Sequence, residues 1–68
     1  MLAIRSQLTH REREVLYLLA TGQTDRNIAE SLTISPRTVN RHVSNIFGKL
    51  EVPSRAAAAV HAVRSGLI

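Results

Sequence analysis

The sequence predicts an all-α fold, a four-helix bundle that contains a helix-turn-helix. Four helix-start signals divide the chain, and the apolar residues between them recur at helical spacing. No stretch shows the alternation of apolar and polar residues that a half-buried strand needs. With 68 residues, of which 44% are hydrophobic, the chain is long enough for one small domain with a single core.

The first two helices are expected to be short and to begin after threonines. Thr9 and Glu12 form a capping box, in which each side chain satisfies a backbone N–H of the other residue. Gly22 supplies the left-handed backbone that commonly ends a helix. Thr24 is expected to cap the second helix, which is brief because only three apolar residues, the last of them Leu32, follow it.

The third helix is expected to span about residues 36–50. Ser35 can cap it, and Pro36 suits its first position because the N–H that proline lacks would be unpaired there. Only residues 33–35 separate this helix from the second one. A short helix, a turn of three or four residues and a longer helix form the helix-turn-helix arrangement.

A fourth helix is expected at about residues 54–66, between a serine cap and a terminal glycine. We interpret residues 1–7 as an N-terminal tail or linker remnant. Residues 8–68 then form the single domain.

Composition excludes several classes of protein. Without cysteine there is no disulfide framework and no thiolate metal site, and the three histidines fall on different expected helices. No apolar run approaches the roughly 20 residues that span a bilayer. A core of this size uses most of the apolar side chains, and no nucleophile motif, carboxylate pair or glycine-rich phosphate loop is present. We therefore expect no enzyme activity, metal, cofactor, membrane contact or small-molecule ligand.

The net charge of +4 comes entirely from the second half of the chain. Residues 1–35 contain four basic and four acidic residues, whereas residues 36–68 contain five basic residues and one acid, Glu51. Eight of the nine basic residues are arginine, whose guanidinium presents a fork of donors to phosphates and guanine edges. The alternative is a basic face that serves solubility alone.

The two faces of the third expected helix differ in chemistry. At about 100° per residue, the core face collects Val39, Val43, Ile46, Phe47 and Leu50. The opposite face collects Arg37, Arg41, Ser44 and Gly48, flanked by Thr38, Asn40 and Asn45. A helix exposed only to water usually mixes glutamate and lysine, but this face has no acid. Arginines, amides and hydroxyls pair with base edges and phosphates, so the pattern favours nucleic-acid binding.

Several short motifs occur together along the chain. They are Leu8 to Leu16 (LTHREREVL), Leu19 to Gly22 (LATG), Ile28-Ala29, Ile34-Ser35, Thr38-Val39, His42-Val43, Lys49-Leu50, Arg55-Ala56 and Gly66 to Ile68. Together they resemble the LuxR-type (LuxR/NarL/FixJ) DNA-binding domain of bacterial transcriptional regulators, over residues 8–68. The resemblance implies a tetrahelical helix-turn-helix domain without a wing, usually a C-terminal output module. It also implies that the third helix enters the major groove and that the fourth forms a dimer contact on DNA.

The same resemblance implies individual contact residues. Base contacts would fall on Arg37, Asn40, Arg41 and Ser44. DNA backbone contacts would fall on Thr24, Ser35, Thr38, Asn45 and Lys49. Asn40 replaces the lysine most common in the family, and an asparagine amide is suited to a contact with adenine. Glu51 replaces the usual glycine after the third helix, at a position that favours a left-handed backbone.

The fourth helix is expected to present two faces of small and apolar residues. We assign Ala56, Ala59, Val60, Val63 and Leu67 to the core. The opposite face is the expected dimer interface and consists of Ala57, Ala58, His61, Ala62 and Ser65. Small uncharged residues allow two helices to approach closely. The alternative is an alanine-rich surface helix, in which alanine serves helix propensity only.

The expected function is sequence-specific binding of a double-stranded DNA operator for transcription regulation, by a homodimer on DNA. RNA polymerase is a further expected partner, and the expected location is the cytoplasm, in association with the nucleoid. The rival interpretation is a helix-turn-helix module used mainly for protein–protein interaction. A steep loss of duplex binding with added salt would distinguish the two, because neutralised phosphates release counterions.

Overall fold

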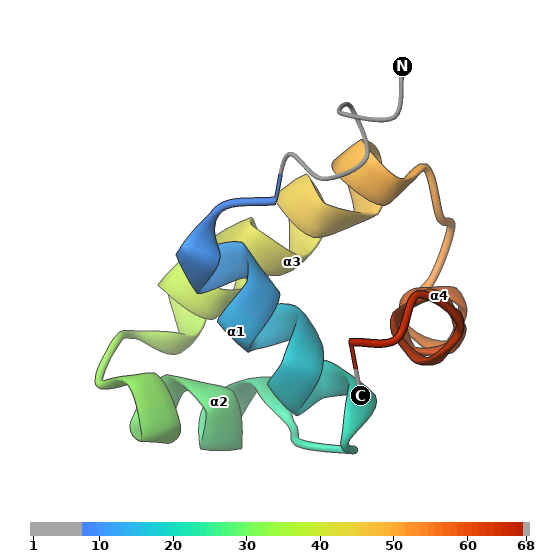
Figure 1. Ribbon diagram of the computed structural model, residues 1–68. Coiled ribbons are helices and arrows are strands. Elements are labelled where there is room, and N and C mark those ends of the chain that lie inside the picture. The colour runs from blue at the N-terminus through green and yellow to red at the C-terminus, as the bar shows by residue number, and fades with distance from the viewer. Residues whose placement is uncertain (1–7, 68) are drawn as a thin grey trace.

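Four helices make up the computed structural model, which describes residues 8–67 (Figure 1). They are α1 (His10–Ala20), α2 (Asp25–Leu32), α3 (Pro36–Leu50) and α4 (Arg55–Arg64). The described residues contain no strand, which confirms the all-α prediction. The expected tail at residues 1–7 lies outside the described residues, as does Ile68.

Each helix begins at the hydroxyl residue that the sequence predicts. Thr9, Thr24, Ser35 and Ser54 are the N-caps, and each side-chain oxygen accepts a hydrogen bond of 3.1 Å from the backbone N–H three residues later. At the start of α1 the Glu12 carboxylate also accepts from the Thr9 N–H at 2.9 Å, which completes the capping box. These bonds satisfy backbone donors that a helix leaves unpaired at its N-terminus.

α1 is the centre of the bundle and packs against each of the other three helices (Figure 1). The core consists of Val15, Leu16 and Leu19 from α1, Ile28 and Ala29 from α2, Val39, Val43 and Ile46 from α3, and Ala58 and Ala62 from α4. Three of the four helices contribute large aliphatic side chains, whereas α4 contributes alanines. α4 therefore contacts the core through small residues at i, i+4 spacing.

The predicted faces of α4 are wrong in part. Ala59 and Leu67, assigned to the core, are half-buried and pack against it, whereas Ala56, also assigned to the core, is exposed. Ala58 and Ala62, assigned to a dimer surface, are completely buried in the core. Val60 and Val63, assigned to the core, are 51% and 61% exposed. The physical reason is the close packing of α4 on α1, where a methyl side chain fits and a valine would hold the two helices apart.

Two non-glycine residues adopt left-handed backbone at helix ends. Glu51 follows α3 with φ of 57°, as predicted from its position. Thr33 follows α2 with φ of 59°, which was not predicted. In both turns the next residue closes the helix end: the Ile34 N–H donates to the Ala29 carbonyl at 3.0 Å, and the Val52 N–H donates to the Phe47 carbonyl at 3.1 Å. The turn between α2 and α3 therefore has a defined geometry.

Candidate nucleic-acid interface

α2, the turn at residues 33–35 and α3 form the helix-turn-helix. Ala29 is buried where α2 meets α3, and its small side chain permits the close contact. The start of α3 is held by the Ser35 hydroxyl, which accepts from the Thr38 N–H and also pairs with the Thr38 hydroxyl at 3.0 Å. The first turn of α3 is thus anchored by its own cap as well as by the core.

The buried side chains of α3 determine which of its residues face solvent. Val39 and Ile46 are completely buried and Val43 is nearly so, which locks the rotation of the helix against α1 and α2. The opposite face is exposed along its whole length, at Arg37, Asn40, Arg41, Ser44, Asn45, Gly48 and Lys49. All four residues predicted to contact bases therefore lie together on one exposed face.

The two arginine charges of this outer face are available to a ligand. α3 contains no Asp or Glu. Among residues 8–67, Arg11 pairs with Glu14 and Arg55 with Asp25, whereas Arg37 and Arg41 form no ion pair or hydrogen bond through their side chains. An unpaired, exposed guanidinium can present its whole fork of donors to an anion or a base edge.

The residues predicted to contact the DNA backbone lie around this face and differ in their exposure and hydrogen bonds. Thr24 and Ser35 are exposed N-caps whose hydroxyls already accept from their own helices. Thr38 is half-buried beside Ser35, and Asn45 is exposed on α3. Lys49 lies at the C-terminal end of α3, so the expected backbone contacts spread from the start of α2 to the end of α3.

Lys49 forms an ion pair across the bundle that the sequence did not reveal. Its ammonium donates to the Glu12 carboxylate at 2.7 Å, and the same oxygen accepts from the Thr9 N–H. Burial of Glu12 raises the pKa of its carboxyl, but the hydrogen bonds from Lys49 and Thr9 together with the Lys49 charge outweigh burial and leave this pKa below its ordinary value. Lys49 therefore joins the end of α3 to the start of α1 as well as facing solvent.

Arg55 is a second connecting residue that sequence reasoning missed. Its guanidinium donates to the Asp25 carboxylate at 2.7 Å and to the Gln23 carbonyl at 2.8 Å. These bonds tie the first residue of α4 to the turn before α2. Opposite charges 30 positions apart in the sequence are not recognisable as a pair until the fold brings them together.

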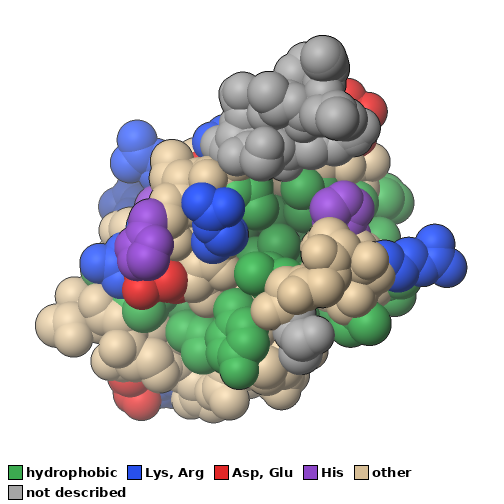
Figure 2. Space-filling model, in the orientation of Figure 1, with side chains coloured by type: hydrophobic (Ala, Val, Ile, Leu, Met, Phe, Trp, Pro, Cys, Tyr) green, Lys and Arg blue, Asp and Glu red, His purple; other side chains and the backbone are tan. Residues whose placement is uncertain are grey.

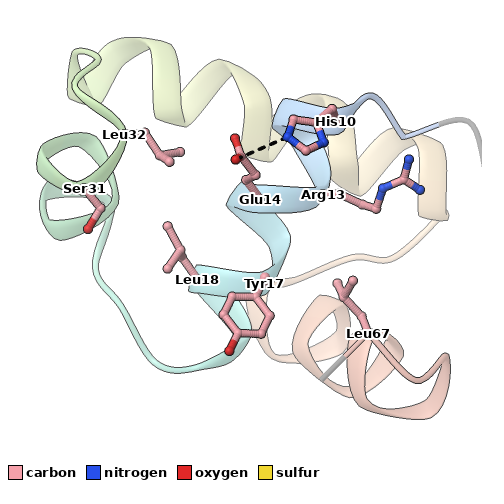
Figure 3. Close-up of a pocket in the computed structure, with 8 residues that line it drawn as sticks. All are labelled: His10, Arg13, Glu14, Tyr17, Leu18, Ser31, Leu32 and Leu67. Carbon is pink, nitrogen blue, oxygen red and sulfur yellow. Dashed lines mark ion pairs between the residues drawn. The ribbon is translucent and has the colours of Figure 1, made fainter.

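A shallow apolar groove lies on a different part of the surface. It is lined by His10, Arg13, Glu14, Tyr17, Leu18, Ser31, Leu32 and Leu67, none of which belongs to α3 (Figure 3). His10 and Glu14 form an exposed pair at 3.4 Å on its rim. Figure 2 shows hydrophobic side chains across the middle of the face that is seen in Figure 1, with charged side chains beside them. The groove is thus distinct in position and in chemistry from the basic face of α3.

None of the helices among residues 8–67 is both long enough and apolar enough to cross a membrane.

Comparisons with known proteins agree with this architecture. Residues 6–62 match the family model described as "GerE: Bacterial regulatory proteins, luxR family". The chain is 49% identical over 61 residues to the uncharacterized transcriptional regulatory protein YhcZ of Bacillus subtilis, and 48% identical to the transcriptional regulatory protein LiaR of the same organism. Each alignment covers 90% of this chain but only 28% and 29% of the relative. The chain therefore spans less than a third of the length of these curated relatives.

A solved structure shares the fold as well as the sequence pattern. The structure described as "Structure of Transcription factor, GerE" superposes with a TM-score of 0.81 at 40% identity, over 91% of this chain and 92% of that chain. The family model matches most of the sequence, and the superposition covers nearly the whole chain. This chain belongs to the luxR family of bacterial regulatory proteins and contains that family's helix-turn-helix DNA-binding domain.

Proposed function

We propose that this chain binds a specific double-stranded DNA operator by inserting α3 into the major groove, and that it thereby regulates transcription. The observation that carries the proposal is the outer face of α3, where Arg37, Asn40, Arg41 and Ser44 are exposed together on a helix without acidic residues. Base edges in the major groove are read by such arginine forks, amides and hydroxyls. The activity is binding rather than catalysis.

Phosphate contacts around this face would set the register of α3 in the groove. We assign them to Thr24, Ser35, Thr38, Asn45 and Lys49, in keeping with the exposed N-caps at the starts of α2 and α3. The ion pair with Glu12 limits what Lys49 contributes, because one acceptor already holds its ammonium. Removing Lys49 would therefore change the stability of the domain together with its affinity for DNA.

We further propose that two copies bind adjacent half-sites through α4, with an interface that keeps Ala57, His61 and Ser65 of the predicted set and replaces the other two residues. Ala58 and Ala62 are buried and cannot contribute. The exposed side of α4 instead offers Val60 and Val63, and a shallow groove there is lined by Val52, Ala57, Val60, His61, Arg64 and Ser65. One face of a ten-residue helix buries less than the roughly 1,200 Å² of a stable interface, so DNA would complete the assembly.

We also propose that this protein acts as a bacterial transcriptional regulator in the cytoplasm, on the nucleoid. Both relatives described above are named as transcriptional regulatory proteins. A contact with RNA polymerase would let the bound domain influence initiation. The domain at residues 8–68 would be its DNA-binding module, preceded by the tail at residues 1–7.

The test compares Arg41→Ala with Arg13→Ala in duplex-binding titrations. Both substitutions remove one exposed, unpaired arginine, but Arg13 lies on α1 beside the apolar groove rather than on α3. With an operator selected from random duplexes, Arg41→Ala should lose about 1–3 kcal/mol of discrimination over a scrambled duplex. Arg13→Ala should retain wild-type discrimination, and both variants should melt like the wild type.

Two outcomes would contradict the proposal. If the wild type selected no sequence and its duplex binding did not fall steeply with salt, the module would serve protein–protein interaction instead. If Arg41→Ala and Arg13→Ala lost discrimination equally, α3 would not be the reading helix.

A further inference from the structure

The first three turns of α3 carry a compact group of base-reading side chains. Arg37, Asn40, Arg41 and Ser44 are all exposed, and among residues 8–67 none of their side chains forms a hydrogen bond or ion pair. Their donors and acceptors are therefore unoccupied in the free domain. The identity of these side chains restricts which bases they can read.

Three of these side chains favour purines. An arginine fork donates to N7 and O6 of guanine, and an asparagine amide both donates to N7 and accepts from the N6 amino group of adenine. The outer face has no carboxylate, which is the side chain that accepts from the amino group of cytosine. The exposed residues of this face also include no alanine, threonine or phenylalanine that could pack on a thymine methyl group, and the flanking Thr38 is half-buried. The three side chains of this face that prefer particular bases therefore favour guanine and adenine.

Helix geometry sets the spacing of the bases. Arg37 and Arg41 are four residues apart, which places them on the same side of α3 and about 6 Å apart along its axis. For α3 lying parallel to the DNA axis, that separation corresponds to about two base-pair steps of about 3.4 Å. Asn40 lies between the two arginines along the axis, three residues after one and one before the other. In that orientation its amide would reach the base pair between those that the arginines contact.

We propose that each half-site contains two G·C pairs separated by one A·T pair, with Arg37 and Arg41 reading the guanines and Asn40 reading the adenine. This inference rests on the proposed function, since it requires α3 to lie in the major groove. It names Asn40 as the residue that determines the base at the centre of the triplet. Ser44 can donate to or accept from any base and so adds no preference of its own.

The test begins with selection of the 68-residue chain on a pool of random duplexes, followed by competition with all four base pairs at the centre of the triplet. The wild type should prefer A·T there by at least about fivefold, as expected for a bidentate contact. Asn40→Ala should reduce the preference at the centre to about twofold or less, while both flanking G·C pairs remain preferred. Asn40→Asp should move the preference at the centre to the C·G pair, because a carboxylate accepts from cytosine.

An atomic substitution in the DNA separates direct reading from an effect of DNA shape. Replacing the central adenine with 7-deazaadenine removes the N7 acceptor and leaves base pairing intact. It should weaken binding of the wild type by at least about fivefold and leave binding of Asn40→Ala unchanged. Asn40 is exposed and unpaired in the fold, so its variants should show the wild-type melting temperature.

The results distinguish failure of this inference from failure of the proposed function. If a motif were selected and Arg41→Ala abolished it, but Asn40→Ala kept the full preference at the centre, the assignment of Asn40 would be overturned while α3 remained the reading helix. The same conclusion would follow if 7-deazaadenine weakened the wild type and Asn40→Ala equally. If no motif were selected at all, the proposed function itself would fail.

Discussion

α3 and α4 differ in how clearly their sequences specify a buried side. In α3 the large aliphatic residues and the polar residues lie on opposite faces. Of the five residues predicted for its core face, Val39, Val43 and Ile46 are buried, and Phe47 and Leu50 are half-buried against the core. In α4 alanines occur on every side, and the valines lie on the side that is exposed. Hydrophobic periodicity therefore predicts a face only where side chains differ in size and polarity. Among near-identical alanines, the shape of the neighbouring helix decides which ones are buried.

The largest predicted change in stability concerns two adjacent residues of α4, one buried and one exposed. Ala62→Glu places a charge in the core without a partner and should cost about 4 kcal/mol or more, which is comparable with the total stability of a domain this small. Val63→Glu lies on the exposed side and should change the free energy of unfolding by about 0.5 kcal/mol or less. Urea denaturation followed by circular dichroism measures both values.

The same pair tests the corrected dimer surface. Val63→Glu should abolish cooperative binding to paired half-sites and retain binding to a single half-site. Equal destabilisation by the two substitutions would mean that α4 is rotated relative to the described packing. Retained cooperativity in Val63→Glu would move the proposed interface away from this side of α4.

The ion pair between Glu12 of α1 and Lys49 of α3 gives the next largest predicted change in the free energy of unfolding. Glu12→Gln removes the negative charge that strengthens the hydrogen bonds from Lys49 and Thr9 to this buried side chain, and it should cost about 1–3 kcal/mol at neutral pH. Glu14→Gln is the control, since Glu14 forms only partly exposed pairs on the same helix, and it should cost about 0.5 kcal/mol or less. Denaturation of both variants at several pH values measures the difference.

The pH dependence of this pair has a definite sign. The pKa of Glu12 is lower in the folded state than its ordinary value, so the folded protein binds the proton less tightly than the unfolded chain. The stabilisation is complete above the ordinary pKa of about 4.3 and is lost as the pH falls through the lower, folded pKa. The stability difference between the wild type and Glu12→Gln should therefore be constant above about pH 5 and narrow in acid. A difference that grew in acid would contradict the assignment.

Substitution of Gly48 measures how much the outer face of α3 lowers the stability of the domain. A Cβ atom built at Gly48 has no neighbour within 4 Å, and this glycine does not require a left-handed backbone. Gly48→Ala should therefore raise the stability by about 0.5–1 kcal/mol through helix propensity alone. Duplex titration of the same variant is the second measurement. An affinity loss of about tenfold would mean that the α3 backbone approaches a phosphate closely at this position.

The two left-handed helix ends give the smallest predicted effects. Glu51→Gly and Thr33→Gly should each raise the stability by less than about 1 kcal/mol, because glycine removes backbone strain but also loosens the unfolded chain. Thr33→Gly should give the larger gain, since a β-branched side chain is more strained at positive φ. Glu51→Gln removes only the charge. If it stabilised the domain as much as Glu51→Gly did, electrostatics at the C-terminus of α3 would explain the gain.

The sequence by itself determined the helices, their starts and the chemistry of the outer face of α3. These features depend on local hydrogen bonding and on a periodicity that one helix contains, such as the cap at Ser35 or the face that carries Arg41. The left-handed backbone of Glu51 was predictable from family resemblance, whereas that of Thr33 was not.

Only the tertiary structure decided which side of α4 is buried and which charges pair between helices. Ala62 is buried because α4 packs this side against α1, and the position of α1 depends on residues far away in the sequence. The partners Glu12 and Lys49 are likewise 37 positions apart. Contacts of this kind depend on the relative positions of whole helices, which no local pattern contains.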